Sequence, residues 1–264
     1  PNPCLRCNEK IKFAAVLERG RALGFDAVAT GHYARLEPSP AGVSLHRSAE
    51  PAKDQSYVLG VLDADQLRHS LFPLGDDTAK AAVRAEAAAR GLTLATKPDS
   101  HDICFIPTGD TAGFLSARLG RRPGDIVDER GEVLGAHDGT HRFTVGQRHG
   151  LHLSVPAGDG RPRYVLGVDP VRNTVTVGPK RALAVRVIEG IRPTWTEQPV
   201  AGAWRGLVQV RAHGDAMPAT IEVAAERVRI GLDEPAYGIA PGQAAVYYDG
   251  DRVVGSATIS STDA

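Results

Sequence analysis

The sequence predicts an α/β domain followed by a β-rich remainder that ends in a small barrel or sandwich. Helical and strand-like segments alternate over the first hundred residues, as they do in α/β domains. From about Pro107 the chain is divided by frequent Gly and Pro, and from about Ala182 short segments of alternating polar and apolar residues recur. With 264 residues, the chain is long enough for two or three such folding units.

Two helices are predicted in the first part of the chain. Apolar residues of 8–23 recur at helical spacing, with Asn8 as a cap at the start and Gly24 as a stop in the left-handed conformation. The second helix, over 77–90, is rich in alanine and ends before Gly91.

Between these helices, the apolar run 27–29 predicts a buried strand that ends at Thr30, Gly31 and His32. Ligands of open α/β sheets bind at this carboxyl edge. Gly31 suits the close approach of a ligand to the backbone, and a simple turn explains it equally well. A histidine here is more often a hydrogen-bonded structural residue than a base.

Four alternating segments in the last part of the chain are predicted strands with the spacing of a barrel or sandwich. They are residues 185–188, 207–211, 219–223 and 244–248. Residues 180–232 contain eight Lys and Arg against five Asp and Glu, which makes them the candidate phosphate-binding face.

The composition excludes several classes of protein. Lys plus Arg and Asp plus Glu both number 31 and 42% of the residues are hydrophobic, which excludes a disordered chain and a global polycation. No apolar run reaches the roughly 18 residues of a membrane span. Three cysteines cannot form a disulfide scaffold, which favours the reducing cytoplasm. The start at Pro1 rather than Met indicates a fragment or a processed chain.

The pair Cys4 and Cys7 carries the first chemical signal. A thiol just before a helix and beside Arg6 is expected to have a lowered pKa and a larger thiolate fraction. A CxxC motif serves zinc sites, redox pairs and plain turns, and its spacing does not choose among them. His101 and Cys104 form an HxxC that would close a tetrahedral zinc site with the first pair, although Cys104 is also explained as a small buried residue.

Two further segments collect polar side chains that suit nucleic acid. Lys53, Asp54 and Gln55 follow a loop rich in Pro, Ser and Gly, and Lys and Gln are suitable contacts for phosphates and bases. Residues 143–151 bring Gln, Arg and His together between glycines. Composition alone fits a phosphate-binding loop and a solvated loop equally well.

Six ordered motifs resemble the tRNA-specific 2-thiouridylases, which replace the C2 oxygen of the wobble uridine with sulfur. They are Asn2–Asn8 with Ile11–Phe13 (NPxxxCNxxIKF), Ala29–Tyr33 (ATGHY), Lys53–Tyr57 (KDQSY), Lys97–Ser100 with Ile103–Ile106, Phe143–Leu151, and Ala240–Gln243. The resemblance implies three parts. Residues 1–106 would be the remainder of a PP-loop (adenine nucleotide alpha hydrolase-like) α/β domain, 107–181 a mixed central domain, and 182–264 a C-terminal β-barrel that contacts tRNA.

The resemblance also implies a mechanism. Cys7 would be the catalytic nucleophile, and Cys104 would carry a persulfide received from a cysteine desulfurase or a sulfur-relay protein. ATP, with Mg²⁺, would adenylate the C2 oxygen, and the persulfide sulfur would replace it as AMP leaves. Cys7 would release sulfide from the persulfide or resolve Cys104 as a disulfide, and the sequence does not choose between these.

Further contacts follow from the resemblance, with the anticodon region of tRNA as the implied partner, no membrane, and the cytoplasm as the implied location. They are Asn2, Pro3 and Cys4 with the target base, Gly31 with ATP, and Lys53, Asp54, Gln55, Arg211 and Ala212 with tRNA. No metal ligand is among them.

Three departures from the family pattern bear on this interpretation. The family's ATP-binding SGGxDS loop does not occur in these 264 residues, so we expect it upstream of Pro1, in which case this chain alone is a fragment that does not adenylate. Cys4 stands where some members have an acid. Ala212 stands where members often have an aromatic residue, which removes a stacking partner.

A different class of protein is the alternative hypothesis. It is a non-catalytic RNA-binding module stabilised by zinc on Cys4, Cys7, His101 and Cys104.

Overall fold

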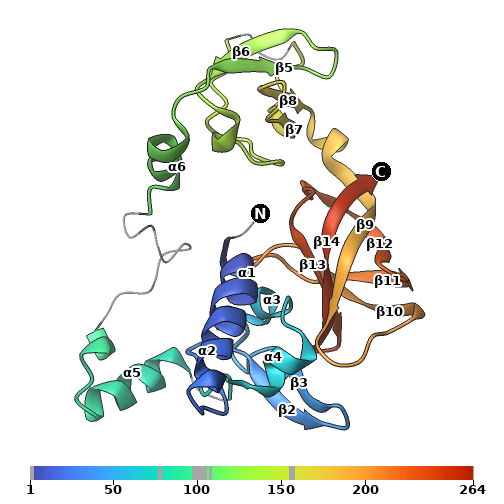
Figure 1. The fold of residues 1–264 in the computed structure, drawn as a ribbon. Coiled ribbons are helices and arrows are strands. Elements are labelled where there is room, and N and C mark those ends of the chain that lie inside the picture. The colour runs from blue at the N-terminus through green and yellow to red at the C-terminus, as the bar shows by residue number, and fades with distance from the viewer. Residues whose placement is uncertain (1–2, 77–78, 97–105, 107–108, 155–157, 264) are drawn as a thin grey trace. The chain divides into compact units, whose positions relative to one another are not determined.

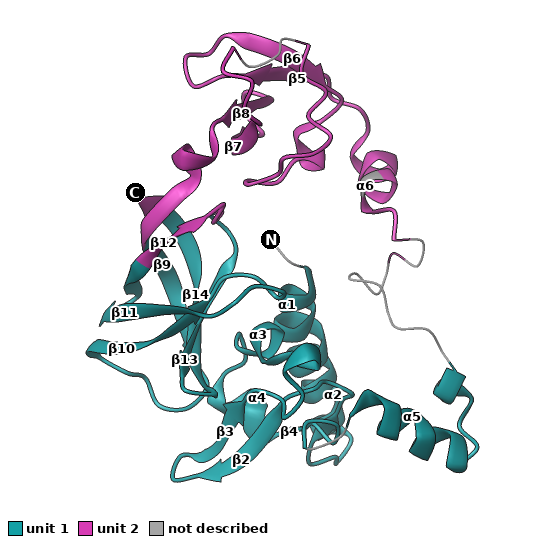
Figure 2. Ribbon diagram, turned by 180° about the vertical axis from the view of Figure 1, so that it is seen from behind, with its two compact units in different colours: residues 1–99, 188–233, 241–261 teal, residues 100–187, 234–240, 262–264 magenta. Residues whose placement is uncertain are grey.

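The computed structural model describes residues 3–76, 79–96, 106, 109–154 and 158–263 (Figure 1). The chain forms two compact units (Figure 2). The first unit comprises residues 1–99, 188–233 and 241–261, and the second comprises residues 100–187, 234–240 and 262–264. Among the helices described, none has the length and apolar character that a membrane crossing needs.

The first unit begins with one continuous helical segment that changes type twice. It runs from α1 (Pro3–Cys7) through a π-helix (Asn8–Ala15) into α2 (Val16–Ala22). The predicted stop is confirmed, because Gly24 has a φ of 87°.

The predicted start of this helix at Asn8 is wrong. The helix already includes Pro3, whose fixed φ and missing N–H suit a first helical position. The Asn8 side chain makes no cap, since its Nδ2 donates to the carbonyl oxygen of Val58 at 2.9 Å. A tertiary contact has therefore replaced the local cap that the sequence suggested.

A small α/β arrangement follows the helix. Strand β1 (Val28–Ala29) pairs in parallel with β4 (Ser70–Leu71). The strand at 28–29 is confirmed, but its predicted burial is wrong, because Val28 is half-buried and Ala29 is exposed. In the part of the chain that the structure describes, this parallel sheet has two strands, so both of them are edge strands. The strands of larger parallel sheets are buried because helices cover both faces of the sheet.

Short helices complete this part of the first unit. They are η2 (Pro51–Lys53), α3 (Ser56–Leu59), α4 (Ala64–Arg68), α5 (Lys80–Ala89) and η3 (Thr93–Thr96). Helix α5 is shorter than predicted at its start and ends as predicted before Gly91, which has a φ of 68°.

A closed six-stranded antiparallel barrel forms from the C-terminal strands. These are β9 (Ala184–Trp195), β10 (Gly202–Gln209), β11 (Met217–Ala224), β12 (Arg227–Tyr237), β13 (Ala244–Asp249) and β14 (Arg252–Asp263). The strand order is β13-β10-β11-β12-β9-β14, and pairing of β13 with β14 closes the ring. The four segments predicted from alternating polarity fall on β9, β10, β11 and β13, although the segment predicted at 207–211 extends two residues beyond the end of β10.

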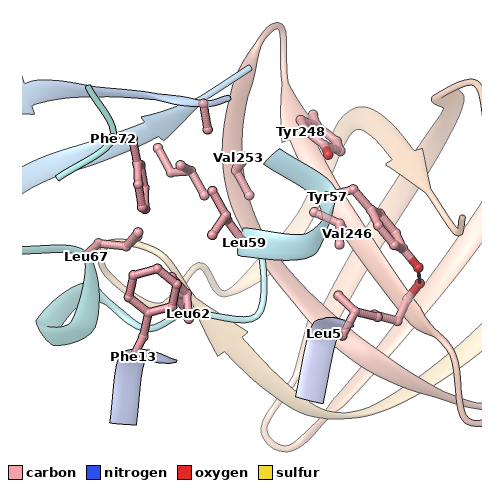
Figure 3. Close-up of a cluster of buried hydrophobic side chains, with 13 residues drawn as sticks. Leu5, Phe13, Tyr57, Leu59, Leu62, Leu67, Phe72, Val246, Tyr248 and Val253 are labelled. Atoms are coloured by element: carbon pink, nitrogen blue, oxygen red, sulfur yellow. Dashed lines mark hydrogen bonds between the residues drawn. The ribbon is translucent and has the colours of Figure 1, made fainter. Parts of the chain in front are cut away.

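The hairpin of β2 (Arg35–Ser39) and β3 (Gly42–His46) extends the barrel sheet, because β3 pairs with β14. The N-terminal part of the first unit and the barrel also share one hydrophobic core. Phe13 and Leu59 from the N-terminal part and Val246 and Val253 from the barrel are buried in it (Figure 3). The Tyr57 hydroxyl donates to the carbonyl oxygen of Ala244 at 3.1 Å. The helix with the two cysteines is thus fixed on the same core as the barrel.

The second unit is mixed, as predicted for the central part of the chain. Helix α6 (Thr111–Leu119) begins after Asp110, whose side chain accepts the N–H of Gly113 at 2.8 Å. The sheet has the order β6-β5-β8-β7 around a core that includes Ile126 and Val175. Its strands are β5 (Gly124–Val127), β6 (Val133–His137), β7 (Tyr164–Asp169) and β8 (Thr174–Gly178), with single turns η4 (Thr140–Arg142) and η5 (Lys180–Leu183).

Candidate active site

Cys7 is a free, partly exposed thiol at the junction of α1 and the π-helix. Cys4 is also partly exposed and lies one helical turn earlier. The expected position of the pair just before a helix is wrong, because the helix starts at Pro3. The charge of the neighbouring Arg6 is compensated, since its Nη1 lies 2.5 Å from Oε2 of Glu9.

The π-helix directly after Cys7 was not predicted. π-Helical segments are rare, and many of those known lie at functional sites. The local sequence carries no signal for them. Here Asn8, at its first position, is 1% exposed and is bonded to Val58 in α3. The turn that carries Cys7 is therefore held against the segment that begins at Ser56.

His32 lies beneath the same helix as a neutral, hydrogen-bonded residue. Lys12 Nζ donates to His32 Nε2 at 3.5 Å, so the proton resides on Nδ1, which donates to the hydroxyl of Thr30 at 2.8 Å. Burial, and then the charge of Lys12, lower the pKa of His32 to about 4. This environment fits the structural role that the sequence favoured over the role of a base.

Gly31, which the resemblance assigns to ATP, is exposed. Its φ is not positive, so a turn does not require glycine at this position. A Cβ atom added there would lie 3.7 Å from Leu74 Cδ1, an ordinary contact distance. Neither a positive φ nor a close contact therefore requires glycine at position 31, and its exposed backbone is compatible with a turn and with the close approach of a ligand.

Gln55 joins the segment of Gly31 to the segment that the resemblance assigns to tRNA. Its N–H donates to the carbonyl oxygen of Tyr33 at 2.8 Å, and its Oε1 accepts the Tyr33 N–H at 3.0 Å. The two motifs, about twenty residues apart, therefore lie side by side.

The Asp54 carboxylate accepts four hydrogen bonds from within the protein. Its Oδ1 accepts the N–H groups of Ser48 and Ser56 at 3.0 and 3.1 Å. Its Oδ2 accepts the Ser56 hydroxyl and Nη1 of Arg47, each at 2.8 Å. With a side chain only 9% exposed, Asp54 shapes the loop that presents Lys53 and Gln55.

The barrel residues Arg211 and Ala212 are fixed by Gln209. The Gln209 Nε2 donates to their carbonyl oxygens at 2.9 and 3.4 Å, while its Oε1 accepts Nη2 of Arg47 at 3.0 Å. Sequence reasoning missed both Arg47 and Gln209. No local pattern marks them, because the bond that joins them spans 162 residues of the chain.

Residues 143–151, in the second unit, form a loop held by its own side chains. The Gln147 Oε1 accepts the N–H of Thr144 at 3.0 Å, and its Nε2 donates to the carbonyl oxygen of His149 at 2.9 Å. Arg148 and His149 are exposed. Gln147 therefore shapes the loop, while its basic residues face solvent.

The expected basic face on 180–232 is partly neutralised by ion pairs with Glu189, inside the segment, and with Asp233, directly after it. Arg205 forms two bonds to the carboxylate of Asp233, at 2.6 and 2.9 Å, and Arg229 bonds Glu189 at 2.7 Å. The surplus of basic residues counted along 180–232 therefore does not form one continuous patch of unpaired positive charge.

Three predicted site residues, Asn2, His101 and Cys104, lie outside the described residues. Within the described ranges, no three His, Cys, Asp or Glu side chains are grouped as a metal site would need. The zinc hypothesis, which needs His101 and Cys104, stays a prediction.

Three family models match the chain in order. They are described as the tRNA methyl transferase HUP domain over residues 1–108, the tRNA methyl transferase PRC-barrel domain over 112–179, and the aminomethyltransferase beta-barrel domain over 185–259.

Curated relatives match almost the whole chain. The tRNA-specific 2-thiouridylase MnmA of Acidothermus cellulolyticus is 62% identical over 262 residues, which are 99% of this chain and 72% of that protein. The chain belongs to the tRNA-specific 2-thiouridylase family. The MnmA proteins of Cutibacterium acnes and of a Nocardioides species are 60% and 62% identical, and the alignments cover all of this chain and 72% and 73% of theirs.

Membership in the tRNA-specific 2-thiouridylases, which are sulfurtransferases, confirms the resemblance carried by the six motifs. It also confirms the predicted order of an α/β domain, a mixed central domain and a C-terminal β-barrel. The roles of individual residues are taken up below as proposals.

Proposed function

We propose that this chain is a tRNA-uridine 2-sulfurtransferase that transfers persulfide sulfur to C2 of the wobble uridine. The family supports the reaction class. The structural observation that carries the proposal is the set of hydrogen bonds that unites the Cys7 helix, the Gly31 segment and the Lys53–Gln55 segment in one compact unit.

ATP is the co-substrate that converts the C2 oxygen into a leaving group. Of the residues that would hold it, this chain contains Gly31, whose exposed backbone fits close approach, and lacks the SGGxDS loop. No step of the ATP reaction is therefore assigned to a side chain described here.

The sulfur step is assigned to Cys7 and Cys104. A sulfur donor loads Cys104 as a persulfide, and the terminal sulfur forms the new bond to C2 while AMP leaves with the oxygen. The Cys7 thiolate attacks the Cys104 sulfur, so that the bond to the terminal sulfur breaks and a disulfide remains. A thiol reductant must reduce this disulfide before the next turnover. Attack before or after C2 bond formation gives the same products.

The remaining residues bind and orient the RNA. Pro3 and Cys4, on the first turn of α1, precede Cys7 by four and three residues and are proposed to contact the target base together with Asn2. Contacts with tRNA are proposed for Lys53, Asp54, Gln55, Arg211 and Ala212, and the Asp54 carboxylate also shapes its own loop.

The test is the 2-thiouridine content of tRNA in cells that carry Cys7→Ser or Cys104→Ser in the natural gene. Each variant should lose the modified nucleoside, as measured by mass spectrometry of digested tRNA. Near-normal thiolation in either variant would contradict the assigned roles. Zinc content of the purified protein tests the alternative, because one zinc per chain, lost in Cys4→Ser, would favour the metal-stabilised module.

A further inference from the structure

We propose that Arg47 is a positioning residue that holds the two tRNA-contact segments, Lys53–Gln55 and Arg211–Ala212, in one fixed arrangement. The inference rests on the proposed function, since it concerns how that RNA surface is assembled. Arg47 itself is not assigned a contact with RNA.

The backbone of Arg47 is anchored at the end of β3. Its N–H donates to the carbonyl oxygen of Asp251 at 2.9 Å, and its carbonyl oxygen accepts Nε of Arg35 at 3.0 Å. The guanidinium lies over the Tyr248 ring, with Cζ 3.8 Å from the ring centroid. The contact with the Tyr248 ring, on barrel strand β13, therefore fixes the plane of the Arg47 guanidinium.

The two terminal nitrogens of Arg47 point to two different segments. Nη1 donates to Oδ2 of Asp54 at 2.8 Å, and Nη2 donates to Oε1 of Gln209 at 3.0 Å. Gln209 lies 162 residues further along the chain than Arg47. A planar fork serves both acceptors at once, whereas a lysine ammonium is a compact point charge.

On one side the link continues into the KDQ loop. Asp54 accepts the N–H groups of Ser48 and Ser56 on its other oxygen, which fixes the backbone on both sides of Lys53. Tyr248 also belongs to the link, because its hydroxyl lies 3.2 Å from Oγ of Ser56.

On the other side the link ends at the barrel segment. Gln209 is 4% exposed, and its Nε2 donates to the carbonyl oxygens of Arg211 and Ala212. Its amide orientation is fixed by these bonds, since only Oε1 can accept from Arg47. A continuous chain of hydrogen bonds therefore runs from the backbone beside Lys53 to the backbone of Arg211.

Two variants cut this link in different ways. Arg47→Lys keeps a positive charge for the Asp54 carboxylate but loses the fork. Gln209→Met keeps a side chain of similar length and leaves the bond between Arg47 and Asp54 in place. Arg205→Lys is the matched control, because Arg205 forks onto Asp233 and does not take part in the link.

The experiment measures the Kd of the 264-residue chain for unmodified tRNA at several salt concentrations, together with the active fraction and the Tm. Each link variant should weaken tRNA binding about three- to tenfold. Because both substitutions break the same link, the Kd of the double variant should not exceed the larger of the two single-variant Kd values. The slope of log Kd against log salt should stay unchanged, whereas Arg211→Ala should lower it by about 0.7 to 0.9. A merely structural role would lower the Tm or the active fraction and leave the Kd of the folded protein unchanged.

Three results would overturn the inference. One is a wild-type Kd in both single variants while Arg211→Ala binds more weakly. Another is an additive loss in the double variant. The third, a wild-type chain that binds no tRNA at low salt, would contradict the proposed function itself and thereby this inference.

Discussion

Asn8 and Val58 are 50 residues apart in the sequence, yet Nδ2 of Asn8 donates a hydrogen bond to the carbonyl oxygen of Val58 at 2.9 Å. Because Asn8 is buried directly after Cys7, this bond fixes the helical turn that carries the proposed nucleophile. Asn8→Ala should lower the free energy of unfolding by about 1 to 3 kcal/mol, because the Val58 carbonyl loses its partner in a partly buried hydrogen bond. Urea denaturation measures the loss.

The control for this variant is Glu9→Ala. Glu9 forms partly exposed ion pairs with Arg6 and Lys10, so its removal should cost less than about 1 kcal/mol. Equal losses in the two variants would contradict the structural role of the Asn8 bond.

Gly31→Ala separates ligand approach from folding. The φ of Gly31 is not positive and the new Cβ would meet only Leu74 at 3.7 Å, so the free energy of unfolding should stay within about 0.5 kcal/mol. The 2-thiouridine content of cellular tRNA should fall, because the methyl group occupies the space of the proposed nucleotide. Gly75→Ala is the contrasting control, since its Cβ would collide with the Ala34 carbonyl and prevent folding. A stable Gly31→Ala protein with full thiolation would refute the nucleotide contact.

His32 should make folding stability depend on pH. Burial and Lys12 lower its pKa from 6.5 to about 4, so between these values the unfolded chain binds more protons than the folded one. Stability is therefore fully present above pH 6.5 and is lost as the pH falls toward 4, by up to roughly 3 kcal/mol.

The measurement is urea denaturation at several pH values in wild type and His32→Gln. The variant should show a flatter pH dependence in this window, whereas His149→Gln, at an exposed loop position, should match wild type. An unchanged slope in His32→Gln would show that His32 is not the titrating group.

The elements that the sequence predicted well are those that local rules determine. The alternating segments at 185–188 and 219–223 fall on barrel strands, because one face of each strand must be buried. Gly24 and Gly91 end their helices because both adopt positive φ.

The features that the sequence did not predict arise where side-chain contacts outside any motif decide the role of a residue. Asn8 looked like a cap because its amide can bond locally, but the Val58 carbonyl takes that bond. The sequence predicted Asp54 as one member of an RNA-contact triplet, and it did not indicate that the carboxylate also holds its own loop through Ser48 and Ser56. Arg47 carries no motif of its own, since its role is visible only when Asp54 and Gln209 lie on either side of it.

The most direct test of the account is the intact mass of the purified chain after incubation with a cysteine desulfurase and cysteine. The account predicts a gain of one sulfur atom that a thiol reductant removes, that Cys104→Ala abolishes, and that Cys7→Ala retains. A chain that gains no sulfur, or a Cys104→Ala variant that gains it as well, would contradict the assignment of Cys104 as the persulfide carrier.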